Sequence, residues 1–407
     1  AVLENDLVLI SSGTSAGRYD YSAQIIRNIG RLLFHGVAIL PGKPAILGEI
    51  QGKPVVGLPG YPVGSQTVLR EIVAPFLVSW GLAPLPHWII RGRLARDMPS
   101  DLGFDEYVPV SAGAVNGTSW IFPHPRGSGL QMNLVRANGY LHIPLASEGW
   151  EAGAWVDIHC TTLPHQIDRT LLCIGAKNPG IRQLAYALAD RSVMLQTFDD
   201  LSSRALLALR KNSCHLVALT IPDLYGDIGA RYAWNDTHAV VIHLGKMPVG
   251  IVSHTSAGSA DLDHLRVVHS PKGSTGRILI DRLIAAKKIG HDQIVMNSNA
   301  VKTEHAVISA VKTGIADVGI SSAVLAKEAG LAFVPLTHEF HVLVARKESL
   351  EDERIQVLLQ IVQSPEFTRS LEEWYTTACT GKVEECTADS FQGNALFRDG
   401  VVDPGTE

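Results

Sequence analysis

Three turns rich in glycine or proline lie within the first 62 residues, and each adjoins a short apolar run. We name them corner 1 (residues 11–17), corner 2 (residues 41–44) and corner 3 (residues 58–62). Ligands of open α/β sheets lie beyond the carboxyl ends of the strands, and helix N-termini there favour anions. Three such turns in order predict an α/β domain with a ligand site along one edge of its sheet.

Corner 1 follows residues 7–10, an apolar run typical of a strand buried on both faces. Asp20 stands where a helix N-cap is expected, and apolar residues recur at helical spacing over residues 21–34, which predicts an amphipathic helix there. Gly13 and Gly17 taken alone require only a tight turn. The other corners favour a ligand site, because the prolines around Lys43 stiffen its backbone and aim its ammonium.

The order and spacing of residues 6–17, Asp20-Tyr21, Pro41-Gly-Lys-Pro and Leu58-Pro-Gly-Tyr-Pro resemble the catalytic domain of the MoeA/gephyrin family, over about residues 5–80. Those proteins insert molybdenum into molybdopterin. The resemblance implies catalytic roles for Asp6, Asp20 and Lys43, with Asp6 and Asp20 as metal ligands. It also implies a pterin and metal site lined by Ser12, Gly13, Thr14, Ser15, Gly17, Pro41, Gly42, Pro44, Pro59, Gly60 and Pro62.

Three positions depart from the family pattern. Thr14 replaces the usual glycine, Arg18 an acid and Tyr61 an asparagine. Arg18 adds positive charge that suits a phosphate or an oxyanion, whereas Tyr61 alters the expected pterin contacts.

The resemblance further implies that the chain binds adenylated molybdopterin and molybdate, and that AMP leaves when the metal is inserted. Mg²⁺ would be bound together with these substrates, since it prefers hard oxygen ligands. The resemblance also implies a homodimer that forms through this part of the chain. Residues 1–80 supply about three parallel strands and two helices, fewer than a covered sheet needs. We therefore expect part of the domain, with some active-site residues, to precede residue 1.

Composition narrows the class of protein. The 407 residues are 46% hydrophobic and 18% charged, which predicts two to four packed domains. A net charge of −5 argues against nucleic-acid binding, and no apolar run approaches the length of a membrane span. Five cysteines without a Cys-x-x-Cys pair indicate reduced thiols in a cytoplasmic protein.

Two further regions follow. Residues 81–163 contain short apolar stretches separated by turns, which predicts a small all-β unit. It resembles the C-terminal β-barrel domain of the same family, which implies that it packs against the site and forms its rim. We interpret Arg126, Ser128 and Gly129 as an ordinary turn. Strand and helix patterns then alternate over residues 168–375, which predicts a second α/β domain, and residues 376–407 form a polar tail.

The second α/β domain resembles type-2 periplasmic binding proteins, which have two lobes, and the effector domains of LysR regulators. It is closest to a molybdate-binding-like domain fused to some MoeA-type proteins. Residues 270–277 place small residues and hydroxyls at a helix start, which predicts an anion site formed by Ser274, Thr275, Arg277 and Thr303. A negative ligand would relieve the unfavourable first-turn position of Arg277. We interpret Asp317 as structural.

These patterns favour a cytoplasmic fusion of a molybdenum transferase module with a domain that binds molybdate, tungstate or another small ligand. The alternative is a non-catalytic sensor of an anion or a cofactor precursor. A transcriptional effector is disfavoured, because no helix-turn-helix segment or basic patch is visible.

Overall fold

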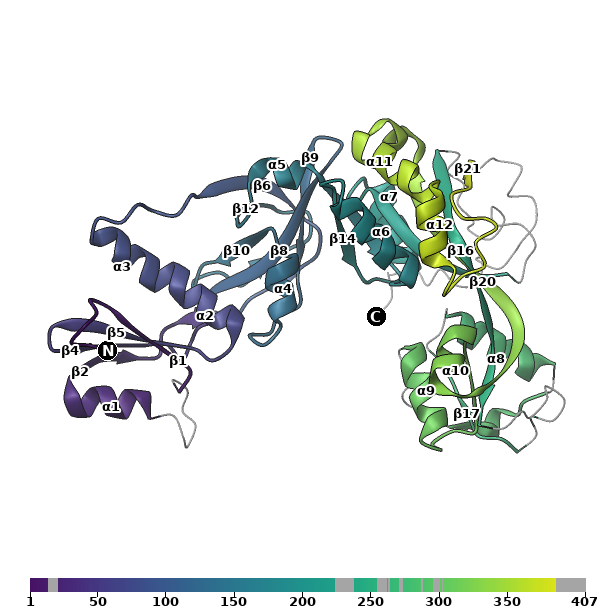
Figure 1. The fold of residues 1–407 in the computed structure, drawn as a ribbon, viewed down its shortest axis with the longest axis horizontal. Helices are drawn as coiled ribbons and strands as arrows, with labels where there is room; N and C mark the ends of the chain where they lie inside the picture. The colour runs from purple at the N-terminus through teal and green to yellow at the C-terminus, as the bar shows by residue number, and fades with distance from the viewer. Residues whose placement is uncertain are drawn as a thin grey trace. The chain divides into compact units, whose positions relative to one another are not determined.

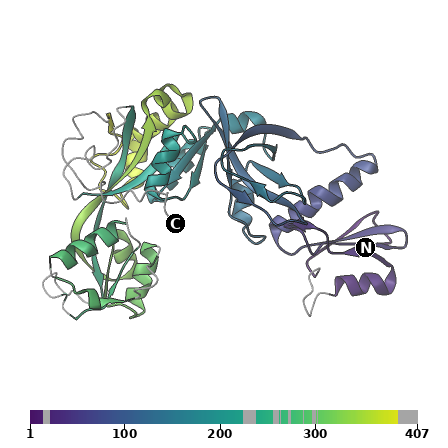
Figure 2. The ribbon, with the colours of Figure 1, turned by 180° about the vertical axis from the view of Figure 1, so that it is seen from behind.

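The computed structural model describes residues 1–13, 21–223, 238–254, 262, 264–270, 274–286, 288–295, 301 and 303–385. The chain divides into two compact units, residues 1–171 and residues 172–407. Figures 1 and 2 draw both units.

The first unit begins with a four-stranded sheet. Its strand order is β1 (Val8–Ser11), β5 (Lys53–Leu58), β4 (Ile46–Ile50) and β2 (Arg31–His35). The α/β class is confirmed, but the predicted parallel arrangement holds only for β1 and β5; β4 is antiparallel to both of its neighbours. The reason is the tight turn at Gln51 and Gly52, both with positive φ, because two-residue turns of this kind join antiparallel strands.

The predicted helix over residues 21–34 is wrong in its second half. Helix α1 spans Ser22–Ile29, and Gly30 separates it from β2. A Cβ on Gly30 would lie 2.2 Å from the Glu49 carbonyl oxygen, so glycine lets the chain pass close to β4. The N-cap residue is Tyr21, so the N-cap assignment for Asp20 is also wrong; Asp20 itself lies outside the described residues.

Helices cover both faces of this sheet (Figure 1). Helix α1 packs Ala23 and Ile26 against one face. Corner 3 leads into α2 (Pro62–Val68), a π-helical turn η1 (Leu69–Val73) and α3 (Ala74–Ser79). From these segments Val68 and Val73 join a separate buried cluster with Ala45, Val56 and Leu58.

A closed β-barrel follows. Its strands, in spatial order, are β10 (Gly139–Ile143), β12 (Trp155–Cys160), β6 (Trp88–Leu94), β9 (Thr118–Pro123) and β8 (Asp105–Val115), and β8 pairs with β10 to close it. The core contains Leu94, Val108, Val110, Ile121, Leu141 and Ile158. The all-β prediction is confirmed for this barrel; the short pair β7 (Met98–Pro99) and β11 (Gly149–Trp150) and the helices α4 (Gln131–Arg136) and α5 (Pro164–Asp168) accompany it.

A short strand in the loop between β2 and β4 pairs with the barrel. β3 (Ile39–Leu40) pairs in parallel with β8, placing Ile39 opposite Asp105 and Leu40 opposite Glu106. Corner 2 follows β3 directly, so this pairing anchors it on the barrel.

The second unit has one large mixed sheet in two lobes (Figures 1 and 2). Lobe A contains β13 (Thr170–Gly175), β14 (Met194–Phe198), β15 (Leu216–Pro222), α6 (Pro179–Ala189), α7 (Ser202–Arg210), α11 (Glu353–Val362) and α12 (Pro365–Leu371). Lobe B contains β17 (Val267–Val268), β18 (Ile294–Val295), β19 (Val318–Ser322), α8 (Thr275–Ala285), α9 (Glu304–Lys312) and α10 (Ala323–Ala329).

Two strands of 15 residues each, β16 (Ala239–Ser253) and β20 (Ala332–Arg346), run through both lobes as an antiparallel pair. Their register shifts between His243 and Gly245 and again between Val249 and Gly250. The predicted two-lobed α/β architecture is confirmed.

The start of the predicted tail is ordered. β21 (Val383–Glu385) pairs with β16, and the Gly381 amide donates to the His243 carbonyl oxygen over 2.9 Å. Residues 386–407 lie outside the described part. Within the tail predicted over residues 376–407, this segment is therefore tethered to the sheet.

Two sequence expectations can be compared with the described residues. Cys160, Cys173, Cys214 and Cys379 are free thiols, as predicted, and Cys386 lies outside the described part. Burial raises the pKa of Cys173 to about 12, so this thiol is inert at neutral pH. Within the described ranges, no helix combines the length and the apolarity needed to cross a membrane.

Candidate functional site

Corners 1 and 3 lie side by side because β1 and β5 are parallel. Ser11 pairs with Leu58, and the Ser12 amide donates to the Leu58 carbonyl oxygen over 3.1 Å. A Cβ on Gly60 would lie 3.1 Å from the Ser12 hydroxyl oxygen, so only glycine allows this close approach without a shift. Gly13 has a positive φ of 69°. Of the other predicted residues of corner 1, Thr14, Ser15 and Gly17 lie outside the described part, as does Arg18.

Corner 2 packs against the start of α2. A Cβ on Gly64 would lie 3.2 Å from the Pro59 ring and 3.6 Å from the Gly42 amide nitrogen. The Ser65 hydroxyl donates to the Pro59 carbonyl oxygen, which fixes corner 3 on the first turn of the same helix. The parallel strands and this helix therefore bring together three corners that are separate in sequence.

A cavity of about 320 Å³ opens between corners 2 and 3 and the barrel. This volume is at the lower end of the range for small-molecule sites. From the corners it is lined by Pro41, Gly42, Lys43, Pro44, Pro59 and Tyr61. From the barrel and its loops it is lined by Glu106, Tyr107, Pro109, Arg126, Gly127 and Ser128. The interpretation of Arg126 and Ser128 as part of an ordinary turn therefore missed their place in the cavity wall.

The charged groups of the cavity are organised around Glu106, which is 7% exposed. Arg126 Nε donates to Glu106 Oε1 over 2.5 Å and its Nη2 donates to Oε2 over 3.1 Å. The Ser100 hydroxyl donates to Oε2 over 2.7 Å. The Lys43 ammonium lies 5.1 Å from the centre of the Phe104 ring and, among the described contacts, has no carboxylate partner. Lys43 therefore gives the rim of the cavity its net positive charge.

The structure does not bring Asp6 to the corners. Asp6 is exposed and precedes β1, whereas Ser12 follows it. The four residues of β1 give the strand a length of roughly 13 Å, so Asp6 and Ser12 lie at opposite ends of it. The described residues contain no group of three or more His, Cys, Asp or Glu side chains that could hold a metal ion. Asp20, the other predicted Mg²⁺ ligand, lies outside the described residues, and we assign no step to that ion.

In the second unit, the predicted anion-binding hydroxyls act as helix caps. Ser274 Oγ accepts from the Arg277 amide over 3.3 Å, and Thr303 Oγ1 accepts from the Ala306 amide over 3.2 Å. Arg277 Nε donates to Asp281 Oδ1 over 2.8 Å. An anion is therefore not needed to balance Arg277, contrary to the sequence argument. Thr275 is buried.

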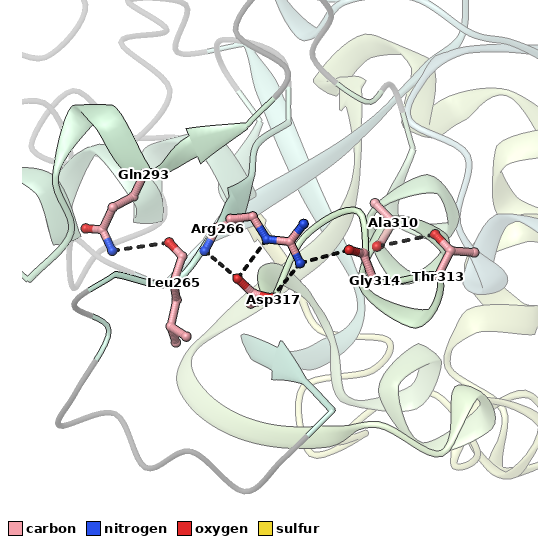
Figure 3. Close-up of polar contacts among 7 residues, drawn as sticks. All are labelled: Leu265, Arg266, Gln293, Ala310, Thr313, Gly314 and Asp317. Atoms are coloured by element: carbon pink, nitrogen blue, oxygen red, sulfur yellow. Dashed lines mark hydrogen bonds and ion pairs between the residues drawn. The ribbon is translucent and has the colours of Figure 1, made fainter.

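Asp317 is structural, in agreement with its interpretation from sequence. Its Oδ2 accepts from the Arg266 amide over 2.8 Å, and its Oδ1 accepts from Arg266 Nη2 over 2.8 Å (Figure 3). Arg266 Nη2 also donates to the Gly314 carbonyl oxygen over 2.8 Å. The hydrogen bonds from Arg266 lower the pKa of the Asp317 carboxyl.

Family models match three successive parts of the chain. Residues 1–79 match the probable molybdopterin binding domain, residues 91–160 match the MoeA C-terminal region (domain IV), and residues 185–363 match the PBP superfamily domain. The first unit is therefore of MoeA type, and a periplasmic-binding-like domain is fused to it.

Three relatives show how far the likeness extends. A putative molybdopterin biosynthesis protein of Methanocaldococcus jannaschii is 36% identical over 159 residues, which are 39% of this chain and 37% of the relative. A molybdopterin molybdenumtransferase of Staphylococcus aureus is 28% identical over 165 residues, which are 40% of this chain and 39% of the relative. A solved molybdenum cofactor biosynthesis protein from Pyrococcus furiosus shares 32% identity with a TM-score of 0.31, covering 39% of this chain and 50% of that chain. The chain thus spans less than two fifths of the length of these two curated relatives.

Proposed function

We propose that the first unit takes part in molybdenum insertion by binding adenylated molybdopterin in the cavity between the corners and the barrel. One observation carries this proposal: corners 2 and 3 and the Arg126–Ser128 loop line a single cavity, and they belong to the two regions that match MoeA-type family models. The relatives are named for molybdopterin or molybdenum cofactor biosynthesis. The residues that line the cavity support the proposal of the same role for this chain.

The cavity suits such a ligand in shape and charge. The prolines of corners 2 and 3 restrict the backbone, which lowers the entropic cost of binding. Tyr61 and Tyr107 give the walls apolar, planar surface for a pterin ring. Lys43 supplies positive charge for a phosphate, and Glu106 fixes the guanidinium plane of Arg126 beside it. In the proposed reaction molybdate is the second substrate and AMP is released. Asp20 stays a candidate for a catalytic carboxylate, whereas Asp6 lies at the opposite end of β1 from corner 1.

Replacing Lys43 tests this assignment. Lys43→Ala should weaken binding of adenylated molybdopterin at least tenfold, because a charge-assisted contact to phosphate is lost. The matched control is Lys53→Ala, at the opposite end of β5 from corner 3. Calorimetric titration of the whole chain measures both affinities, and a parallel assay with molybdate measures AMP release. Equal affinities in the two variants would contradict the site, whereas binding without AMP release would favour the non-catalytic sensor.

For the second unit we propose binding of a small ligand between or beside its lobes. An oxyanion at the starts of α8 and α9, near Ser274, Thr275, Arg277 and Thr303, is the class predicted from sequence. Titration with molybdate, tungstate, sulfate and phosphate tests it. We also propose a homodimer formed through the first unit, which sedimentation of the chain tests, and a cytoplasmic location.

A further inference from the structure

β20 carries two buried polar side chains, Glu339 and His341. Glu339 is 4% exposed and His341 is 5% exposed. Their closest polar contact is with each other, 3.7 Å between His341 Nε2 and Glu339 Oε2, which is too long for a hydrogen bond. Neither ring nitrogen of His341 has a hydrogen-bond partner. Burying an imidazole without partners is costly, so a ligand that pairs with this ring would offset that cost.

The two side chains belong to one polar cluster at the start of α6. Residues 339 and 341 lie on the same face of the strand, whereas Phe340 lies on the other face with Lys246, whose ammonium is 4.2 Å from that ring. The Tyr375 ring lies 5.1 Å from the His341 ring. The Tyr375 hydroxyl accepts from the Gly180 amide over 3.2 Å and donates to Asn178 Oδ1 over 3.3 Å. Asn178 Nδ2 is buried and has no partner.

The charge around this cluster is negative. Burial raises the pKa of the Tyr375 phenol, and the charges of Glu339 and Glu304 raise it further. Glu304 comes from α9 of lobe B, where its Oε2 accepts from the Ser322 amide over 3.0 Å. The exposed Arg182, which lies 5.5 Å over the Trp374 ring, acts in the opposite direction, and its charge lowers the pKa of the Tyr375 phenol. Carboxylates from two lobes thus act on one phenol.

The unmet groups define what a ligand must offer. Glu339 can only accept hydrogen bonds when ionised, Asn178 Nδ2 can only donate, and neutral His341 does one of each. An oxyanion such as molybdate offers acceptors only and is repelled by Glu339. An ionised carboxylate pairs best with two adjacent N–H donors. A ring with an amino group beside a ring N–H supplies two adjacent donors for a carboxylate. A carbonyl next to them supplies an acceptor for Asn178 Nδ2 or His341.

We propose that the second unit binds a ligand with a 2-amino-4-oxopyrimidine ring, the chemistry shared by pterins and guanine, through Glu339, His341 and Asn178. The ring's amino group and N–H donate to Glu339, and its acceptors meet Asn178 Nδ2 and His341. This inference rests on the proposed ligand-binding role of the second unit and names the class of ligand.

The test titrates the whole chain with unsubstituted pterin and with guanosine, and then with molybdate. Glu339→Gln keeps the shape of the side chain but removes its charge, and should weaken binding of the preferred ring compound at least tenfold. Asn178→Ser keeps a good N-cap but removes Nδ2, and should weaken binding severalfold. The matched control is Glu366→Gln, whose carboxyl lies on the exposed face of α12 and whose variant should bind like the wild type.

The first unit requires its own control, because its cavity is also proposed to bind a pterin. Binding that is lost in Glu339→Gln and kept in Lys43→Ala supports the inference, and the preference for pterin or guanosine identifies the source of the ring. Binding that is lost only in Lys43→Ala overturns it, as does the absence of binding of both ring compounds. Molybdate binding that Glu339→Gln leaves unchanged overturns the ring class while supporting the ligand-binding role. Thermal melting of each variant confirms folding before titration.

Discussion

The cavity of the first unit and the polar cluster of the second unit each contain a buried glutamate, but the two sites differ in how their polar side chains are hydrogen-bonded. In the first unit, Glu106 accepts from both Arg126 and Ser100. In the second unit, Glu339 Oε2 lies 3.7 Å from His341 Nε2, and neither nitrogen of the His341 ring has a hydrogen-bond partner in the described part of the chain. A site whose charges are paired in the free protein is held in shape by its own contacts. A site with unpaired groups is completed by what it binds.

Buried histidines extend the same comparison. In the barrel, His124 Nε2 lies 2.8 Å from the Ser111 hydroxyl oxygen, and both side chains are buried. His341 is equally buried, but both of its nitrogens lack partners. The first histidine should therefore contribute to folding stability, whereas the second should not.

The largest effect we expect comes from pH. Burial, aided by the charge of Arg136, lowers the pKa of His124 to about 4, whereas the unfolded chain takes up this proton near pH 6.5. Stability is therefore complete above pH 6.5 and falls by about 2–3 kcal/mol as the pH drops toward 4. His124→Gln should remove this part of the pH dependence. Thermal denaturation of both proteins at several pH values measures the difference, and parallel curves would contradict the role of His124.

The next effect compares two arginines. Arg126→Ala leaves Glu106 buried without its cation and should cost about 2 kcal/mol, less than for a fully buried pair because the Arg126 side chain is 45% exposed. Arg266→Ala removes an exposed pair with Asp317 and should lower the melting temperature only slightly. Chemical denaturation of the two variants measures both. Similar losses would mean that burial does not set the difference between these pairs.

The smallest effect should come from His341→Phe. Replacing an unpartnered polar ring by an apolar ring of similar shape should change stability by less than about 0.5 kcal/mol, or raise it. The control is His124→Phe, which should lower stability by about 1 kcal/mol because the hydrogen bond to Ser111 is lost. A large loss in His341→Phe would show that this ring has partners in the free protein and would remove the contrast between the units.

Much of the first site could be predicted from sequence, because its signals are local. Glycine and proline at residues 41–44 and 58–62 restrict the backbone wherever they occur, and the cavity is built on them. The place of Arg126 could not be predicted in this way, since it depends on the pairing of β3 with β8. The extent of α1 was misjudged because Gly30 ends it: the residue needs close contact with β4, and a helical pattern carries no sign of that contact.

The anion site predicted at the starts of α8 and α9 stays a prediction. Ser274 and Thr303 look like anion ligands in sequence, but their hydroxyls are used as helix caps. Another signal lies on β20, where Glu339 and His341 alternate with apolar residues in the buried half of the strand. Two polar residues on one face of a core strand indicate a buried polar site, although their lack of partners is visible only in three dimensions.

The two long strands that both lobes share have a mechanical consequence. The lobes are joined by a continuous hydrogen-bonded ribbon, so the angle between them is an elastic property of the sheet and not of a linker. The ribbon bends most easily where its register shifts, and Gly245 lies at one of these points. A Cβ on Gly245 would lie 2.7 Å from the Tyr375 Cβ, so the backbone there touches the residue that holds the start of α6. Any bend of the ribbon at Gly245 would therefore move Tyr375 and its hydrogen bond to the start of α6.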